Sequence, residues 1–171
     1  LSKGATDGVN LILNIGGMLL TFIAIIFAIN WVLMDGIGAF TGLNAYVISS
    51  TNGAFEGFSL QYILGQIFRF FAFVIGISWN ESLLVGSLLG QKFVINEFVG
   101  YVSLAEMKSS GVLSERAIII STYALCGFAN LSSIGIQIGG IGAMAPSRRK
   151  DLSLLGFKAL VGASLSTMMT A

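Results

Sequence analysis

The sequence has 171 residues, of which 55% are hydrophobic and 10% charged, and its mean hydropathy is +0.88. Since soluble domains carry about 25% charged residues, this composition predicts an integral membrane protein, and a net charge of +1 gives no support to nucleic-acid binding. The single cysteine excludes an internal disulfide, and the lack of histidine removes the commonest metal ligand and general base.

The first predicted element is a spanning helix in residues 1–40. No charged residue occurs from Gly8 to Met34, whereas a span needs about 20 apolar residues. Asn10 and Asn14 are spaced to share one face, where they would bond a neighbouring helix. An equally acceptable explanation is that both asparagines are merely tolerated. Because the sequence begins with leucine and ends in an apolar segment, we expect it to be part of a longer chain.

A glycine-rich stretch separates this helix from the rest of the sequence. Residues 41–57 are predicted to be a connecting loop, and residues 58–171 a second domain. The first segment of that domain, Phe58 to Ile75, is apolar but holds Arg69 among several phenylalanines. This pattern favours a helix at the membrane interface over a clean span.

Residues 79–99 are predicted to form a re-entrant helical hairpin. Its apolar part, from about Leu83, is too short and glycine-rich for a span and its return, and we expect the turn near Gly90. Such backbone is tolerated at membrane depth where protein or a cavity covers it. The alternative is one ordinary helix whose Lys92 and Glu97 face a neighbour.

The last two elements are a discontinuous helix and a truncated final helix. Residues 117–145 are long enough to span, but glycines interrupt them, as in the broken helices that form substrate sites near the bilayer midplane. Residues 152–171 begin the last span. The basic cluster between the two elements, Arg148 to Lys150, predicts that their connection is cytoplasmic.

Glu97 carries the strongest functional signal, because an acidic side chain at membrane depth is costly and generally faces a partner or a substrate. Its two carboxylate oxygens match a vicinal diol such as the 2′ and 3′ hydroxyls of ribose. Asn96, beside it, offers both a donor and an acceptor. These two residues therefore predict a binding site for a polar solute within the membrane.

A second polar cluster lies about thirty residues downstream. Asn130 and Ser133 are three residues apart and share a face of any helix there. Phe128 lines the same cavity only if the backbone unwinds near Gly127, whose lack of a Cβ permits it. Taken singly, each of these residues is equally well explained by helix packing, and Cys126 is expected to be a small buried residue.

Three long stretches carry a family resemblance: GQKFVINEFVGY at 90–101, TYALCGFANLSSIG at 122–135 and APSRRKDL at 145–152. The segments GATDGVN at 4–10 and WNE at 79–81 also fit. At these residues the sequence resembles the C-terminal part of the concentrative nucleoside transporters, over nearly the whole chain. Ser78 and Gly100 depart from residues that are common in the family, and neither departure puts the site in doubt.

The resemblance implies an all-α elevator-type transporter that imports nucleosides through the plasma (inner) membrane as a homotrimer, driven by Na⁺ or H⁺. It assigns ribose binding to Glu97, Asn130 and Ser133, and packing on the base to Phe128. In the family, the first half of the protein supplies the base-reading hairpin and most of the sodium site. This chain would therefore hold the ribose side alone.

Two other classes of function are alternatives to transport. An intramembrane enzyme would need catalytic groups, but this sequence has no histidine, catalytic dyad or metal-ligand spacing. We therefore predict neither an enzyme nor a cofactor. A non-transporting membrane module or sensor of the nucleoside-gate type is the remaining alternative. The sequence leaves open the coupling ion and the preference between purines and pyrimidines.

Overall fold

The structure is a computed structural model that describes residues 2–171. Within this range it leaves undescribed the side chains at 2–5, 7, 10, 11, 14, 15, 18, 19, 140, 143 and 144. The predicted face of Asn10 and Asn14 therefore lies outside the described side chains. Every regular element from residue 2 onwards is a helix, and the chain divides into two compact units, residues 1–60 and 61–171.

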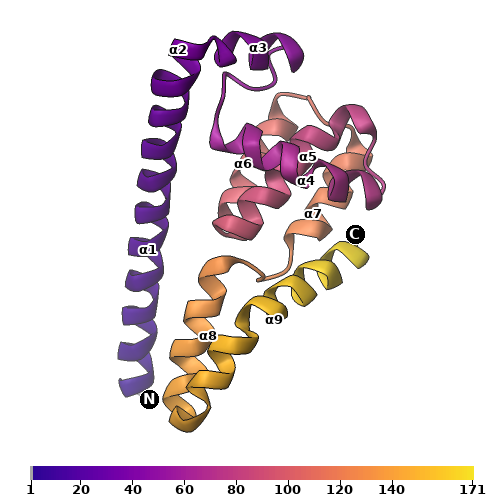
Figure 1. Cartoon of the computed structure of the whole chain (residues 1–171). Coiled ribbons are helices and arrows are strands. Elements are labelled where there is room, and N and C mark those ends of the chain that lie inside the picture. The colour runs from indigo at the N-terminus through magenta and orange to yellow at the C-terminus, as the bar shows by residue number, and fades with distance from the viewer. Residues whose placement is uncertain (1) are drawn as a thin grey trace. The chain divides into compact units, whose positions relative to one another are not determined.

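The first unit consists mainly of one long apolar helix (Figure 1). α1, Ser2–Trp31, continues through a π-helical segment, Val32–Gly38, into α2, Ala39–Thr41. The part from Leu20 to Thr41 is long and apolar enough to cross a membrane. The helix predicted in residues 1–40 is thus present, and Asp35 lies within its π-helical segment.

The segment predicted to be a connecting loop, residues 41–57, contains a helix. That helix is α3, Leu43–Ser50, so the prediction of a loop is wrong at these residues. Glycines with positive φ, Gly42 at 74° and Gly53 at 78°, flank α3 and leave a glycine-free run between them, which is free to form a helix. Asn44 on α3 then joins the unit together. Its Nδ2 donates to the Met34 carbonyl at 2.9 Å, and its Oδ1 accepts from the Phe58 amide at 2.9 Å.

The second unit begins with two helices that meet at a bend of 117°. They are α4, Leu60–Val74, and α5, Trp79–Val94. Glycines allow their backbones to approach closely. A Cβ at Gly86 would lie 2.7 Å from the Gly65 carbonyl oxygen and 2.8 Å from the Arg69 amide nitrogen.

Arg69 stabilises the bend from the α4 side. Its Nε donates to Ser82 Oγ at 3.0 Å, and its Nη2 donates to the Trp79 carbonyl at 3.1 Å. The guanidinium also lies 3.9 Å from the centre of a Trp79 ring, where a cation–π interaction is favourable. The arginine that marked this segment as interfacial therefore has partners at the start of α5.

The chain turns at Ile95 and Asn96, which corrects the turn expected near Gly90. α5 continues through Gly90 as a helix, and α6, Glu97–Ser109, begins after the turn. Gly90 faces α4, where a Cβ would approach the Leu64 Cβ to 2.6 Å, so the glycine permits packing rather than reversal. The two arms, α5 and α6, pack against each other as a helical hairpin.

The discontinuous helix is confirmed in the remaining part of the unit. α7, Glu115–Leu125, ends before residues 126–130, and α8, Leu131–Met144, begins after them. A 3₁₀ turn, Pro146–Arg148, leads into α9, Arg149–Met169, which lies beside α8 (Figure 1). The stretch from Pro146 to Met169 is the second one long and apolar enough to cross a membrane.

Candidate substrate site at the helix break

Two helices of the second unit start at asparagines that the sequence analysis assigned to a substrate. Asn96 precedes α6, and its Oδ1 accepts from the Val99 amide at 3.0 Å. Asn130 precedes α8, and its Oδ1 accepts from the Ser133 amide at 2.8 Å. Asparagine is a preferred N-cap because its side chain satisfies an amide that the helix leaves unpaired. Both residues therefore have a structural role.

Ser133 completes the cap of α8. Its Oγ accepts from the Asn130 amide at 3.4 Å and donates to the Asn130 carbonyl at 2.7 Å. The bond from the Asn130 amide to Ser133 Oγ and the bond from the Ser133 amide to Asn130 Oδ1 together form a capping box. Ser132 Oγ adds a further bond to Asn130 Oδ1, at 2.6 Å. The amide oxygen of Asn130 thus accepts two hydrogen bonds, while its Nδ2 group takes no part in the cap.

The Nδ2 group of Asn130 joins the break to the hairpin. It donates to Glu97 Oε2 at 2.9 Å, and Asn130 is 0% exposed. Glu97 is part-buried and occupies the first turn of α6, where the helix dipole favours a negative charge. Within the described residues, Glu97 Oε1 makes no hydrogen bond. An oriented carboxylate therefore keeps one oxygen available to a ligand.

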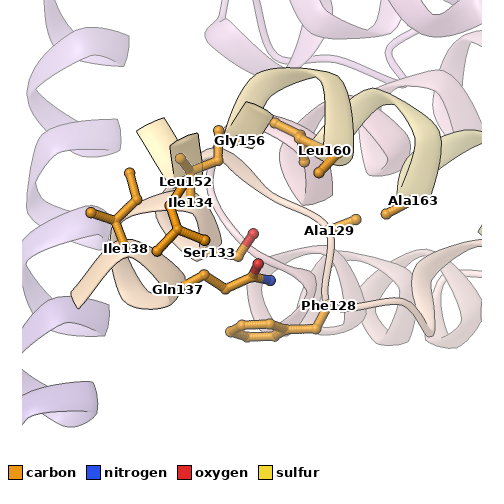
Figure 2. A pocket seen from close by; sticks show the side chains of 11 residues that line it. Phe128, Ala129, Ser133, Ile134, Gln137, Ile138, Leu152, Gly156, Leu160 and Ala163 are labelled. Carbon is orange, nitrogen blue, oxygen red and sulfur yellow. The ribbon is translucent and has the colours of Figure 1, made fainter. Parts of the chain in front are cut away.

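A small cavity of about 120 Å³ lies at the cap of α8, between α8 and α9 (Figure 2). Phe128 and Ser133 both line it, which places two of the predicted site residues around one space. Glu97, Asn96 and Asn130 do not line it. The structure therefore brings the predicted residues together as two adjoining parts: a carboxylate–amide pair, and a cavity with an aromatic ring and a hydroxyl.

The whole chain matches one protein-family model. That family is described as "Na+ dependent nucleoside transporter C-terminus", and the match covers residues 1–171. The chain belongs to this nucleoside transporter family. Membership confirms the resemblance to the concentrative nucleoside transporters and the prediction that the chain is not an enzyme.

Curated proteins similar to this chain include bacterial and vertebrate members. The chain is 42% identical over 170 residues to the uncharacterized transporter YutK of Bacillus subtilis, covering 99% of this chain and 38% of YutK. It is 37% identical over 179 residues to sodium/nucleoside cotransporter 2 of Mus musculus, covering 96% of this chain and 25% of that protein. The chain therefore spans less than two fifths of the length of either relative.

A solved structure of the family has the same fold. The structure of CNTnw in an inward-facing, substrate-bound state is 41% identical in sequence to this chain and superposes with a TM-score of 0.84. The superposition covers 98% of this chain and 38% of that one. This similarity confirms the all-α fold with its helical hairpin and discontinuous helix.

Gln137 is a polar residue at the cavity that the sequence did not predict. Gln137 lies one helical turn after Ser133 and lines the same cavity. Its amide is turned towards the space that the Ser133 hydroxyl and the Phe128 ring also face (Figure 2). No hydrogen-bond partner of Gln137 occurs in the described part of the chain. The spacing from Ser133 was a signal that could have identified it.

The prediction for Cys126 is wrong, whereas the prediction for Asn96 stays a prediction. Cys126 is exposed, which corrects the expectation of a buried residue. It follows the last turn of α7, where the chain leaves the helix. Asn96 is buried, but its Oδ1 is occupied by the cap of α6. Its contact with a substrate stays a prediction.

Proposed function

We propose that the complete protein imports nucleosides across the plasma (inner) membrane, driven by Na⁺ or H⁺, and that this chain supplies the ribose side of the substrate site. One observation carries the proposal: the Glu97 carboxylate is held by Asn130 while its second oxygen remains free. A carboxylate so placed accepts hydrogen bonds from the paired hydroxyls of a ribose.

The remaining groups complete a reversible binding site. Asn130 Nδ2 has a second hydrogen beyond the one given to Glu97, and Ser133 Oγ keeps acceptor capacity. Phe128 is exposed and offers its ring to the flat face of a base. None of these contacts requires covalent chemistry, so the site suits capture and release of an unmodified solute.

The assembly and the rest of the site are part of the same proposal. α1 presents apolar side chains to its surroundings, with Leu20 71% and Phe27 75% exposed, which suits contact with lipid or a neighbouring subunit. A multi-pass homotrimer, as the family resemblance implies, would cover part of this surface. The base-selecting groups and most of the sodium site belong to the part of the protein outside this chain.

Uptake of labelled uridine and adenosine by vesicles containing the complete protein tests this proposal. Sodium-dependent uptake of either nucleoside would support a sodium symporter, and uptake that follows a proton gradient instead would support proton coupling. Binding of nucleoside without flux would replace the proposal by the non-transporting nucleoside-gate type of module. The absence of both binding and flux would overturn it.

Substitution of Gln137 tests the cavity as part of the site. In the complete protein, Gln137→Leu keeps the size of the side chain but removes an amide that we place against the nucleoside. We expect the KM for uridine to rise about fivefold, the equivalent of one hydrogen bond, with little change in maximal rate. Initial uptake rates over a range of uridine concentrations measure both quantities.

The matched control is Gln66→Leu, because Gln66 is an exposed glutamine on α4 that does not line the cavity. Its KM for uridine should equal that of the unsubstituted protein. An unchanged KM in Gln137→Leu would show that the substrate does not reach this cavity.

A further inference from the structure

Lys92 is a buried cation that the proposed site does not use. It lies in the last turn of α5 and is 3% exposed. A buried ammonium is strongly unfavourable unless several polar groups compensate it. From the sequence, Lys92 is expected only to face a neighbouring helix, so its partners in the structure indicate what it does.

The first partner of Lys92 is the end of α7. Its Nζ donates to the Ala124 carbonyl oxygen at 2.8 Å. Ala124 belongs to the last turn of α7, whose carbonyls have no amide partner within the helix because the chain breaks at residues 126–130. A cation at a helix C-terminus is favoured by the dipole as well. Lys92 therefore compensates a carbonyl that the break leaves unpaired at the buried end of α7.

The second partner is Thr167 on α9. Lys92 Nζ donates to Thr167 Oγ1 at 2.9 Å. The methyl group of Thr167 lies directly against Gly127, since a Cβ on that glycine would come within 2.0 Å of Thr167 Cγ2. Thr167 thus contacts the break with its methyl group and binds Lys92 with its hydroxyl. The two partners together attach α5 to both the break and α9.

The other side of the proposed site lies just across the hairpin turn from Lys92. Lys92 is in the last turn of α5 and Glu97 is in the first turn of α6, so that opposite charges face each other across the turn. Glu97 in turn accepts from Asn130 Nδ2, at the end of the break. Lys92 therefore lies beside the turn that precedes Glu97, and it reaches the break that precedes Asn130 through Ala124 and Thr167.

We propose that Lys92 is a positioning residue: with Thr167 it fixes the break relative to the hairpin, and so sets the geometry of Glu97 and Asn130 for ribose. The proposal rests on the proposed nucleoside transport. Neither Lys92 nor Thr167 lines the cavity or bonds directly to Glu97 or Asn130. Their effect on affinity is therefore indirect and specific to the ribose hydroxyls.

Two substitutions of Thr167 in the complete protein separate the hydroxyl from the methyl group. Thr167→Val keeps the β-branched shape against Gly127 and removes the acceptor for Lys92, whereas Thr167→Ser keeps the hydroxyl. We expect the KM for uridine to rise about fivefold in Thr167→Val, as for one lost hydrogen bond, and to stay near its original value in Thr167→Ser. Lys92→Met should raise it further, since it removes both bonds.

The decisive readout is the discrimination between uridine and 2′,3′-dideoxyuridine, measured as the ratio of the uridine KM to the inhibition constant of the dideoxy compound. We expect the inhibition constant of 2′,3′-dideoxyuridine to stay the same in Thr167→Val while the KM for uridine rises. A purely structural role would lower only the maximal rate, in proportion to the amount of protein in the membrane, and would overturn the inference.

The outcomes for the two proposals are distinguishable. Uridine uptake by the unsubstituted protein, with an unchanged uridine KM in Thr167→Val, overturns the positioning role alone. Absence of nucleoside binding and flux in the unsubstituted protein overturns the proposed function and the positioning role with it. If Lys92→Met does not reach the membrane, the comparison of Thr167→Val with Thr167→Ser decides the question by itself.

Discussion

Replacement of Glu97 by glutamine in the complete protein is expected to lower the ratio of maximal rate to KM for uridine uptake by about 100-fold. Hydrogen bonds to a charged group contribute about 1.5–3 kcal/mol each, and a loss of two such bonds corresponds to at least this factor. Glutamine retains one oxygen, which Asn130 Nδ2 occupies in the structure. Its amide nitrogen then faces the ribose hydroxyls, where an acceptor is needed. Initial rates of uptake over a range of uridine concentrations measure the effect.

The matched control for this substitution is Glu106→Gln, which removes an exposed carboxylate from the same helix, α6. Uptake by this variant should equal that of the unsubstituted protein. Inhibition by 2′,3′-dideoxyuridine should be nearly unaffected by Glu97→Gln, because that compound lacks the hydroxyls. A loss of affinity for the dideoxy compound as large as that for uridine would contradict the ribose assignment.

Replacement of Gly86 by alanine is expected to destabilise the second unit by about 3 kcal/mol, at the upper end of the cost of overpacking. The added Cβ would lie 2.7 Å from the Gly65 carbonyl oxygen and 2.8 Å from the Arg69 amide nitrogen. Both are backbone atoms, so α4 and α5 can relieve the contact only by moving apart. The midpoint of thermal unfolding of the detergent-solubilised complete protein measures the effect.

Gly100→Ala is the control within the same hairpin. Its Cβ would meet the end of the Leu125 side chain at 3.1 Å and the Leu88 carbonyl oxygen at 3.5 Å, and a side-chain end can shift at low cost. Because alanine also favours a helix over glycine by about 0.5–1 kcal/mol, we expect a midpoint close to the original. Equal midpoints for the two variants would mean that α4 and α5 do not pack at Gly86 as described.

The composition and the polar interruptions of this sequence were sufficient for much of the fold and part of the site. Low charge content predicts a membrane protein because charged groups are costly in lipid. Gly127, within an apolar run that also carries Asn130 and Ser133, predicts the break between α7 and α8, because glycine and local hydrogen-bonding side chains favour non-helical backbone. Glu97 is recognisable by the same cost of burial.

The position of the hairpin turn could not be read from the sequence. Gly90 and Asn96 are both acceptable places for the chain to reverse, and the choice depends on what surrounds each. Gly90 packs against Leu64 on another helix, whereas Asn96 has room to cap α6. A glycine that permits close packing and a glycine that permits a turn have the same local sequence signal.

Local sequence thus determined the membrane class, the longer helices, the break and the identity of the costly acidic residue. Only the tertiary structure decided which of these groups meet. The bonds from Lys92 to Ala124 and Thr167, and from Asn130 to Glu97, join residues far apart in the chain. Such bonds depend on how helices pack, because propensity and hydrophobic pattern act over a few residues while a buried polar group is satisfied by whichever helix lies beside it.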